Sequence, residues 1–89
     1  MEDLVLDGNA IGGLLSEIFI HEVTGATSRC DRCGALEPVG ALSAYVQAPG
    51  VVLRCPHCEA VLVRVVQTVG RTWLDLRGLS YLELRNGTA

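Results

Sequence analysis

The sequence predicts a small α+β protein in which an antiparallel β-sheet is organised around a bound metal ion and carries one N-terminal amphipathic helix. Three observations lead to this fold class. Cysteines occur as two matched pairs, apolar residues recur at helical spacing over residues 9–20, and β-branched residues are frequent after residue 23. The 89 residues are expected to form one domain, 1–89, with the helix at 9–20 and the metal-bound part at 23–84.

The cysteines predict one metal site with four thiolate ligands. Cys30 and Cys33 form the first C-x2-C pair, Cys55 and Cys58 form the second, and 21 residues separate the two pairs. Two residues between thiolates allow a tight turn to direct both sulfurs at one point, so two such turns complete a tetrahedral shell. Paired motifs of this kind are more typical of metal binding than of disulfides. A closed shell also disfavours a catalytic metal, which keeps an open position.

Residues 9–20 predict the helix. Its apolar positions follow the i, i+3, i+4, i+7, i+8 spacing of a single stripe, and they are Ile11, Leu14, Leu15, Ile18 and Phe19. Asp7 or Asn9 is the expected N-cap, because a short side chain with an oxygen can accept a hydrogen bond from the first turn. The Gly12-Gly13 pair weakens the helix by about 1 kcal/mol per glycine relative to alanine.

After residue 23 the pattern predicts β-strands joined by short turns. Extended segments are expected at residues 23–30, 42–48, 51–55, 61–69, 72–77 and 79–84. The run at 61–69 is expected to be the central strand, 79–84 an edge strand, and Pro49-Gly50 a tight turn. Aromatic residues make up only 4% of the chain, so the core is expected to consist of Val, Leu, Ile and Ala.

The residues around the cysteine pairs suit two tight metal turns. Gly34 follows the first pair and can adopt a positive φ, whereas Glu59 in the equivalent place would cost about 1–2 kcal/mol in that conformation. His57 lies inside the second pair and is expected to be an exposed turn residue, because four cysteines already complete the shell. His21 is expected to be a surface residue or a partner of the helix C-terminus.

Charge is unevenly distributed. Residues 1–22 carry five acidic and no basic residues, a charge of −5, and the remainder carries seven Arg and five acidic residues, a charge of +2. Four thiolates and one divalent ion add −4 + 2 = −2, which takes the formal charge from −3 to −5. This balance disfavours nucleic-acid binding. The acidic start and the short apolar stretch predict a soluble cytoplasmic protein without a secretory signal or membrane span.

Two surfaces are candidate contacts with a protein partner. Gly12, Gly13 and Ser16 share a smooth face of the predicted helix, which could equally be a weak helix held only by its apolar side. Trp73 falls on the more polar face of its strand, where it could contact a partner or be covered by the helix or the last segment. Because the sequence lacks a Ser/His/Asp constellation, a phosphate-binding glycine loop and a carboxylate pair, we expect no enzymatic activity.

Four segments carry a family resemblance. The stretches LDGNA at 6–10, GLLSEIF at 13–19, APGVVLRCPHC at 48–58 and WLDLRG at 73–78 resemble a family of short bacterial proteins known only as a domain of unknown function. The resemblance implies a zinc-ribbon-like fold with the four cysteines as ligands. An oxidoreductase component is one candidate partner. The cysteine turns are also similar to those of rubredoxin, in which the same thiolate shell holds iron, although Glu59 replaces its second glycine.

The predicted function is therefore a zinc ribbon with a structural zinc ion that acts as an accessory module and binds a protein partner. One alternative is a rubredoxin-like electron carrier that binds iron and serves an oxidoreductase. A second alternative is a zinc ribbon that binds nucleic acid. A tetrahedral shell of four sulfurs accepts either zinc or iron, so the motif alone leaves the metal open.

Overall fold

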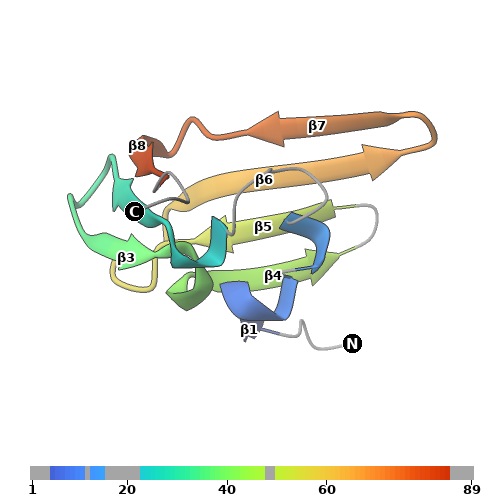
Figure 1. Ribbon diagram of the computed structural model, residues 1–89. Coiled ribbons are helices and arrows are strands. Elements are labelled where there is room, and N and C mark those ends of the chain that lie inside the picture. The colour runs from blue at the N-terminus through green and yellow to red at the C-terminus, as the bar shows by residue number, and fades with distance from the viewer. Residues whose placement is uncertain (1–4, 12, 16–22, 48–49, 85–89) are drawn as a thin grey trace, which may run out of the picture.

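The computed structural model describes residues 5–11, 13–15, 23–47 and 50–84. Most of these residues lie in antiparallel strands that form a five-stranded and a three-stranded sheet (Figure 1). The larger sheet has the strand order β1-β4-β5-β6-β7. Its strands are β1 (Val5–Asp7), β4 (Ser43–Gln47), β5 (Gly50–Arg54), β6 (Val61–Thr68) and β7 (Arg71–Asp75).

The smaller sheet lies at one end of the larger one, at the left in Figure 1. Its strand order is β3-β2-β8, with strands β2 (Thr27–Cys30), β3 (Leu36–Pro38) and β8 (Leu79–Glu83). Strand β2 leads into the first cysteine pair, and β5 of the larger sheet leads into the second. The two cysteine turns therefore come from different sheets.

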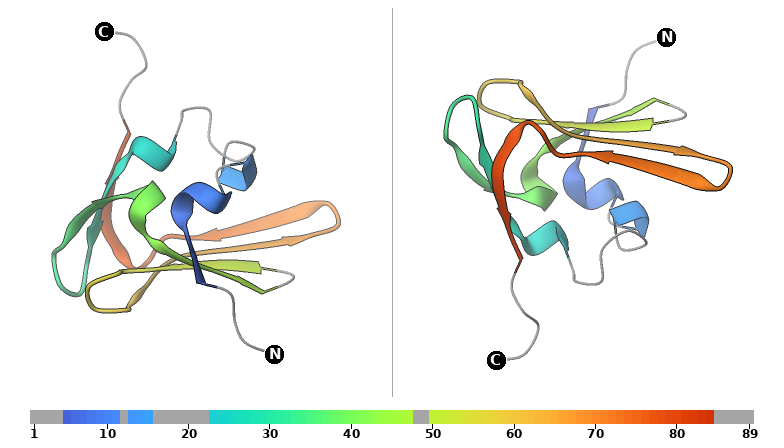
Figure 2. Two further views of the ribbon diagram at one scale, coloured as in Figure 1. Left: turned by 90° about the horizontal axis from the view of Figure 1, so that it is seen from below. Right: turned by 90° about the horizontal axis from the view of Figure 1, so that it is seen from above.

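Short helical turns cover one face of the five-stranded sheet. They are the 3-10 turns η1 (Gly8–Ile11), η2 (Val23–Gly25) and η3 (Val39–Ala41), together with one α-helical turn at residues 13–15. Figure 2 shows these turns gathered on the same side of the sheet. Among the described residues no helical element lies on the opposite face, so that face of the sheet is open.

The core lies between the sheet and these turns. On β5, Val51 and Leu53 are buried while their neighbours are not, as the alternation of a strand with one covered face requires. The buried apolar residues are Leu15, Val23, Ala26, Cys30, Val39, Leu42, Ala44, Val51, Leu53, Cys55, Leu62, Val63 and Val65. No aromatic side chain of the described residues is among them, in agreement with the aliphatic core expected from composition.

The expected amphipathic helix over residues 9–20, and with it the α+β fold class, is wrong. The described chain is mostly antiparallel strand in two sheets rather than one ribbon, and it contains no helix of seven or more residues. Residues 12 and 16–20 of the expected helix lie outside the described residues. None of the described helices is long and apolar enough to cross a membrane.

Tertiary contacts and glycine explain why the apolar spacing did not produce a long helix. A Cβ on Gly8 would lie 2.0 Å from the carbonyl oxygen of Val39, so the chain is in close backbone contact with η3 just after β1. Asp7 does act as a cap, since its carboxylate accepts a hydrogen bond from the Ala10 N–H at 3.2 Å, but it caps the short η1 turn. The apolar stripe still reaches the core through Leu15, which is buried.

The strand predictions were largely confirmed, with shifted ends. The expected strand at 23–30 begins only at Thr27, because η2 occupies its start. Strand β6 is an interior strand of its sheet, whereas β8 is an edge strand of the smaller sheet. Strand β3 was not predicted, because three residues are too few to establish an alternating pattern. Of the expected Pro49-Gly50 turn, residue 49 lies outside the described residues.

Candidate metal centre

The first cysteine turn is closed by two backbone hydrogen bonds. The Cys30 N–H donates to the carbonyl of Ala35 at 3.0 Å, and the Gly34 N–H donates to the carbonyl of Cys30 at 2.9 Å. Gly34 has a φ of 80°, in the left-handed region that glycine enters without cost. The positive φ expected after the first cysteine pair is therefore confirmed.

The second cysteine turn repeats this arrangement. The Cys55 N–H donates to the carbonyl of Ala60 at 2.9 Å, and the Glu59 N–H donates to the carbonyl of Cys55 at 2.8 Å. Glu59 occupies the place equivalent to glycine in the first turn and has a φ of 64°, which is strained for a residue with a Cβ. The two turns thus share one geometry although only the first carries the favourable residue.

The four cysteine sulfurs form a compact group. The Sγ atoms of Cys30 and Cys58 are 3.6 Å apart, those of Cys33 and Cys55 are 3.7 Å apart, and all four lie within 4.8 Å of one another. A tetrahedron with metal–sulfur bonds of about 2.3 Å has edges of about 3.8 Å. The group therefore fits a single metal ion bound by one sulfur from each cysteine.

Backbone N–H groups point at the two buried sulfurs of the group. The Cys33 N–H points at the Sγ of Cys30, and the His57 N–H points at the Sγ of Cys55, each at 3.4 Å. Cys30 and Cys55 are buried, whereas Cys33 is exposed and Cys58 is half-buried. Each turn thus supplies one inner, protected sulfur and one sulfur nearer the surface.

The thiols of Cys30 and Cys33 differ in pKa. Burial opposes a charge on Cys30, but hydrogen bonds from the backbone of Cys33 and Arg32 outweigh it and lower the pKa of Cys30 to about 7. For Cys33, a backbone hydrogen bond at Ala35 favours the thiolate, yet lost hydration and the Cys55 thiol raise its pKa to about 11. A metal ion entering the group at neutral pH must therefore displace the proton of Cys33.

Metal affinity should consequently rise with pH. Because at least the proton of Cys33 is displaced by each metal ion, the apparent association constant should increase at least about tenfold for each pH unit below the pKa of Cys33. Competition with a chromophoric chelator between roughly pH 6 and pH 9, after correction for the chelator's own protonation, measures this slope. An affinity that does not change with pH would contradict ligation by thiolates.

Replacing Glu59 by glycine should stabilise the metal-loaded protein by about 1 kcal/mol, because the left-handed backbone at this position no longer carries a side chain. Gly34→Ala is the matched reverse change and should destabilise by a similar amount. Chemical denaturation of both variants with the metal bound measures the difference. Equal free energies of unfolding for the Glu59→Gly variant and the unaltered protein would show that this backbone is not strained.

Side chains beside the cysteine turns hold the turns to the smaller sheet. Arg29 Nη1 donates to Ser80 Oγ at 2.9 Å, and Ser80 Oγ donates to the carboxylate of Asp31 at 2.9 Å. His57 is exposed, as expected, and its Nε2 lies 2.5 Å from Glu37 Oε2 on β3. Sequence analysis missed the Glu37 contact, because it depends on the unpredicted strand β3.

The candidate partner residues are only partly described. Trp73 is 49% exposed on β7, so neither the helical turns nor β8 covers it. Gly13 is exposed in the helical turn at 13–15, whereas Gly12 and Ser16 lie outside the described residues, as does His21. The smooth helix face is therefore described only at Gly13, and Trp73 is the other candidate contact that lies on the surface.

The open sheet face carries an aromatic and arginine group that the sequence analysis did not identify. Tyr45 and Val52 are opposite each other on β4 and β5, Val52 is opposite Arg64, and Arg64 is opposite Asp75. The Arg54 guanidinium lies over the Tyr45 ring, 5.4 Å from its centroid. The sequence signal for this face was that alternate residues of four strands point outward. Recognising the group also required the strand order, because that order decides which of these residues are neighbours.

These features define a class: a small antiparallel β protein with a four-cysteine group that could bind one metal ion. The chain belongs to the family of unknown function DUF6510, whose model matches residues 1–87. No curated protein and no solved structure matches the chain significantly.

Proposed function

We propose that this protein is a small interaction module whose four cysteines bind one structural zinc ion. The observation that carries the proposal is the closed group of four sulfurs within 4.8 Å on two turns of the same geometry. Four thiolates in a tetrahedral shell suit zinc and leave no open position for a substrate. The zinc is expected to contribute folding free energy rather than chemistry, and we propose no catalytic role.

The position of the sulfurs supports a structural role. Cys30 ends β2 in the smaller sheet, and Cys55 follows β5 in the larger one. A metal ion bound by both turns would cross-link the two sheets. In a chain of 89 residues with an aliphatic core, burial of the core alone gives only marginal stability. The metal cross-link would add to the free energy of folding.

The Trp73 surface supports a binding role. The half-exposed indole borders an open pocket of about 430 Å³, lined by Arg64, Val66 and residues 73–77. Exposed tryptophan beside arginine is a frequent composition of protein contact sites, because the ring offers a large apolar area and the guanidinium offers directed hydrogen bonds. We propose this surface as the contact site for a protein partner.

A second candidate function is electron transfer with iron in the same shell. The observation that favours it is the exposure of the sulfurs: Cys33 is exposed and Cys58 is half-buried, so one ligand of each turn lies near the surface. A redox partner could approach an iron ion through these sulfurs. The partner would then be an oxidoreductase component.

Metal analysis of protein purified from its natural host separates the two functions. Purification at native abundance matters, because overexpression can load zinc into an iron site. One zinc per chain and a colourless protein would support the structural role. One iron per chain, red when oxidised and bleached by dithionite, would overturn it in favour of electron transfer. A chain without metal would overturn both.

A further inference from the structure

Strand β7 is an unprotected edge. It is the last strand of the five-stranded sheet, and the β6–β7 hairpin projects beyond the core in Figures 1 and 2. Trp73 is 49% exposed, Leu74 is 37% exposed, and Val69 in the hairpin turn is fully exposed. Native edge strands usually carry proline, a bulge or charged side chains that prevent pairing with another chain. β7 contains no proline, lysine or bulge, and its two charged residues, Arg71 and Asp75, have opposite signs.

The backbone of β7 offers free hydrogen-bonding groups at defined residues. Thr68 and Arg71 are the closing pair of a two-residue turn, and such a pair exchanges both of its backbone hydrogen bonds. Because the ladder alternates, Trp73 and Asp75 also direct their backbone groups toward β6. The N–H and C=O groups of Thr72 and Leu74 therefore point away from the sheet, toward a strand that could be added.

The side chains of β7 are complementary to themselves. Arg71, Trp73 and Asp75 share one face of the strand, because they alternate with Thr72 and Leu74. In an antiparallel pair of two β7 strands centred on Trp73, Arg71 of each chain lies opposite Asp75 of the other. The two Trp73 side chains are then neighbours, and the outward backbone groups of Thr72 and Leu74 face each other.

Other registers lose this complementarity. Centring the pair on Leu74 would place Arg71 opposite Arg77, which is a repulsive arrangement. Centring it on Thr72 would place Arg71 opposite Trp73 and leave Asp75 without a basic residue opposite it on the second strand. Opposite charges directly across a ladder stabilise pairing and like charges destabilise it, so the charges on β7 select the register centred on Trp73.

We propose that the occupant of the Trp73 surface is a second copy of this chain, joined through antiparallel pairing of two β7 strands about a two-fold axis at Trp73. This inference rests on the contact role proposed for Trp73 and names its partner. Pairing of this type joins the two five-stranded sheets into one continuous sheet and places the two indole rings side by side. The contact is isologous, so it closes as a dimer and leaves no β7 edge free for further growth.

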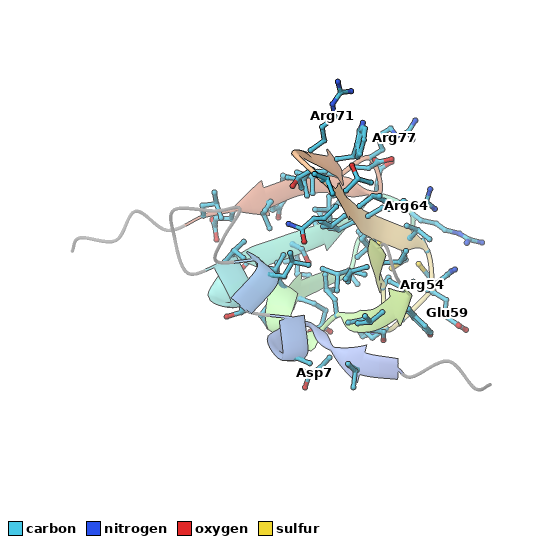
Figure 3. All side chains as sticks on the ribbon, turned by 90° about the vertical axis from the view of Figure 1, so that its right-hand side faces the viewer. Asp7, Arg54, Glu59, Arg64, Arg71 and Arg77 are labelled. Atoms are coloured by element: carbon cyan, nitrogen blue, oxygen red, sulfur yellow. The ribbon has the colours of Figure 1, made fainter. Side chains whose placement is uncertain are left out.

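An acidic segment of another protein is the competing occupant. Figure 3 shows Arg64 and Arg77 on the open side of the sheet and Arg71 at the end of the hairpin. These arginines would attract acidic side chains. However, Asp75 lies among them and binds Arg77 through Nε and Nη2 at 2.7–3.1 Å. Its carboxylate would repel an acidic strand, whereas a second β7 brings arginine to the place opposite it.

Sedimentation velocity of the metal-loaded full chain tests the proposal by charge exchange. The protein should form dimers as its concentration is raised from about 10 µM to about 1 mM, and its single tryptophan should show a blue-shifted emission in the dimer. Arg71→Asp and Asp75→Arg each create two like-charge pairs and should weaken the dimer at least about tenfold. The Arg71→Asp/Asp75→Arg double variant exchanges the charges and should restore the dimer.

Leu74→Pro tests the backbone pairing separately. Its N–H points away from β6, so proline should leave the fold and the metal content intact while it prevents strand addition. A chain that stays monomeric at every concentration, or a double variant no better than the single variants, overturns the self-pairing. Binding of an acidic peptide to such a monomer would identify the competing occupant. If the monomeric protein still binds one zinc per chain, only the self-pairing is refuted and the proposed zinc site is unaffected. If the protein has lost its metal, the zinc site itself has failed.

Discussion

Cys30→Ser should abolish the folded state. Cys30 is 1% exposed, and its sulfur lies in the group that joins the two sheets, so its loss leaves an incomplete shell between them. Binding of a structural zinc contributes about 10–16 kcal/mol in zinc-finger peptides, which equals or exceeds the whole stability of a typical domain, about 5–15 kcal/mol. Circular dichroism should show loss of the β-sheet signal, and metal analysis should show less than one zinc per chain.

His57→Ala is the matched control for this change. His57 lies within the second cysteine turn, but it contacts Glu37 on the surface and supplies no ligand to the four-sulfur group. An exposed ion pair of this kind contributes at most about 1 kcal/mol, so the variant should keep its zinc and its fold. Removal of the metal ion from the unaltered chain with a strong chelator should reproduce the Cys30→Ser result. A Cys30→Ser protein with an unchanged melting temperature would refute the structural role of the metal.

Gly78→Ala should be strongly destabilising. A Cβ at Gly78 would lie 2.0 Å from the carbonyl oxygen of Val61 and 2.6 Å from the Cα of Leu62, both of which belong to the backbone of β6. The carbonyl of Gly78 also accepts a hydrogen bond from the Asp31 N–H at 3.0 Å, in the first cysteine turn. Relief of the clash must move β6 or this turn, so we expect a loss of at least about 2 kcal/mol.

Gly25→Ala is the control for the loss of glycine itself. Gly25 is exposed at the end of η2, and a Cβ there would meet no atom within 4 Å. Its free energy of unfolding should change by less than about 0.5 kcal/mol. Urea denaturation of both variants in the metal-loaded form measures the contrast. Equal stabilities would show that the backbone does not pass as closely at Gly78 as the structure indicates.

Local chemistry was sufficient to predict the candidate metal site. Two residues between paired cysteines bring their sulfurs together in a tight turn whatever the rest of the fold does. Gly34 and Glu59 marked the left-handed positions for the same reason, because the geometry of a turn is set by residues a few positions apart. Most strands were also predictable, since alternation and β-branched composition act within a single segment.

The N-terminal segment and the sheet surfaces depended on tertiary structure. The apolar spacing of residues 9–20 is that of an amphipathic helix. However, Val5–Asp7 gains hydrogen bonds by pairing with β4, and Gly8 follows in close contact with η3. Such contacts join residues more than 30 positions apart, and no local pattern encodes them. The exposure of Trp73 likewise followed from the position of β7 at the sheet edge.

Residue type and short spacing were enough to establish which four sulfurs meet, the geometry of their turns and the aliphatic nature of the core. The three-dimensional arrangement was needed to show that the two cysteine turns come from different sheets, that the described part of the N-terminal segment forms a strand and short helical turns, and that β7 is a free edge. Strand order and layer contacts depend on the summed burial and hydrogen bonding of distant segments, and one-dimensional patterns do not specify that sum.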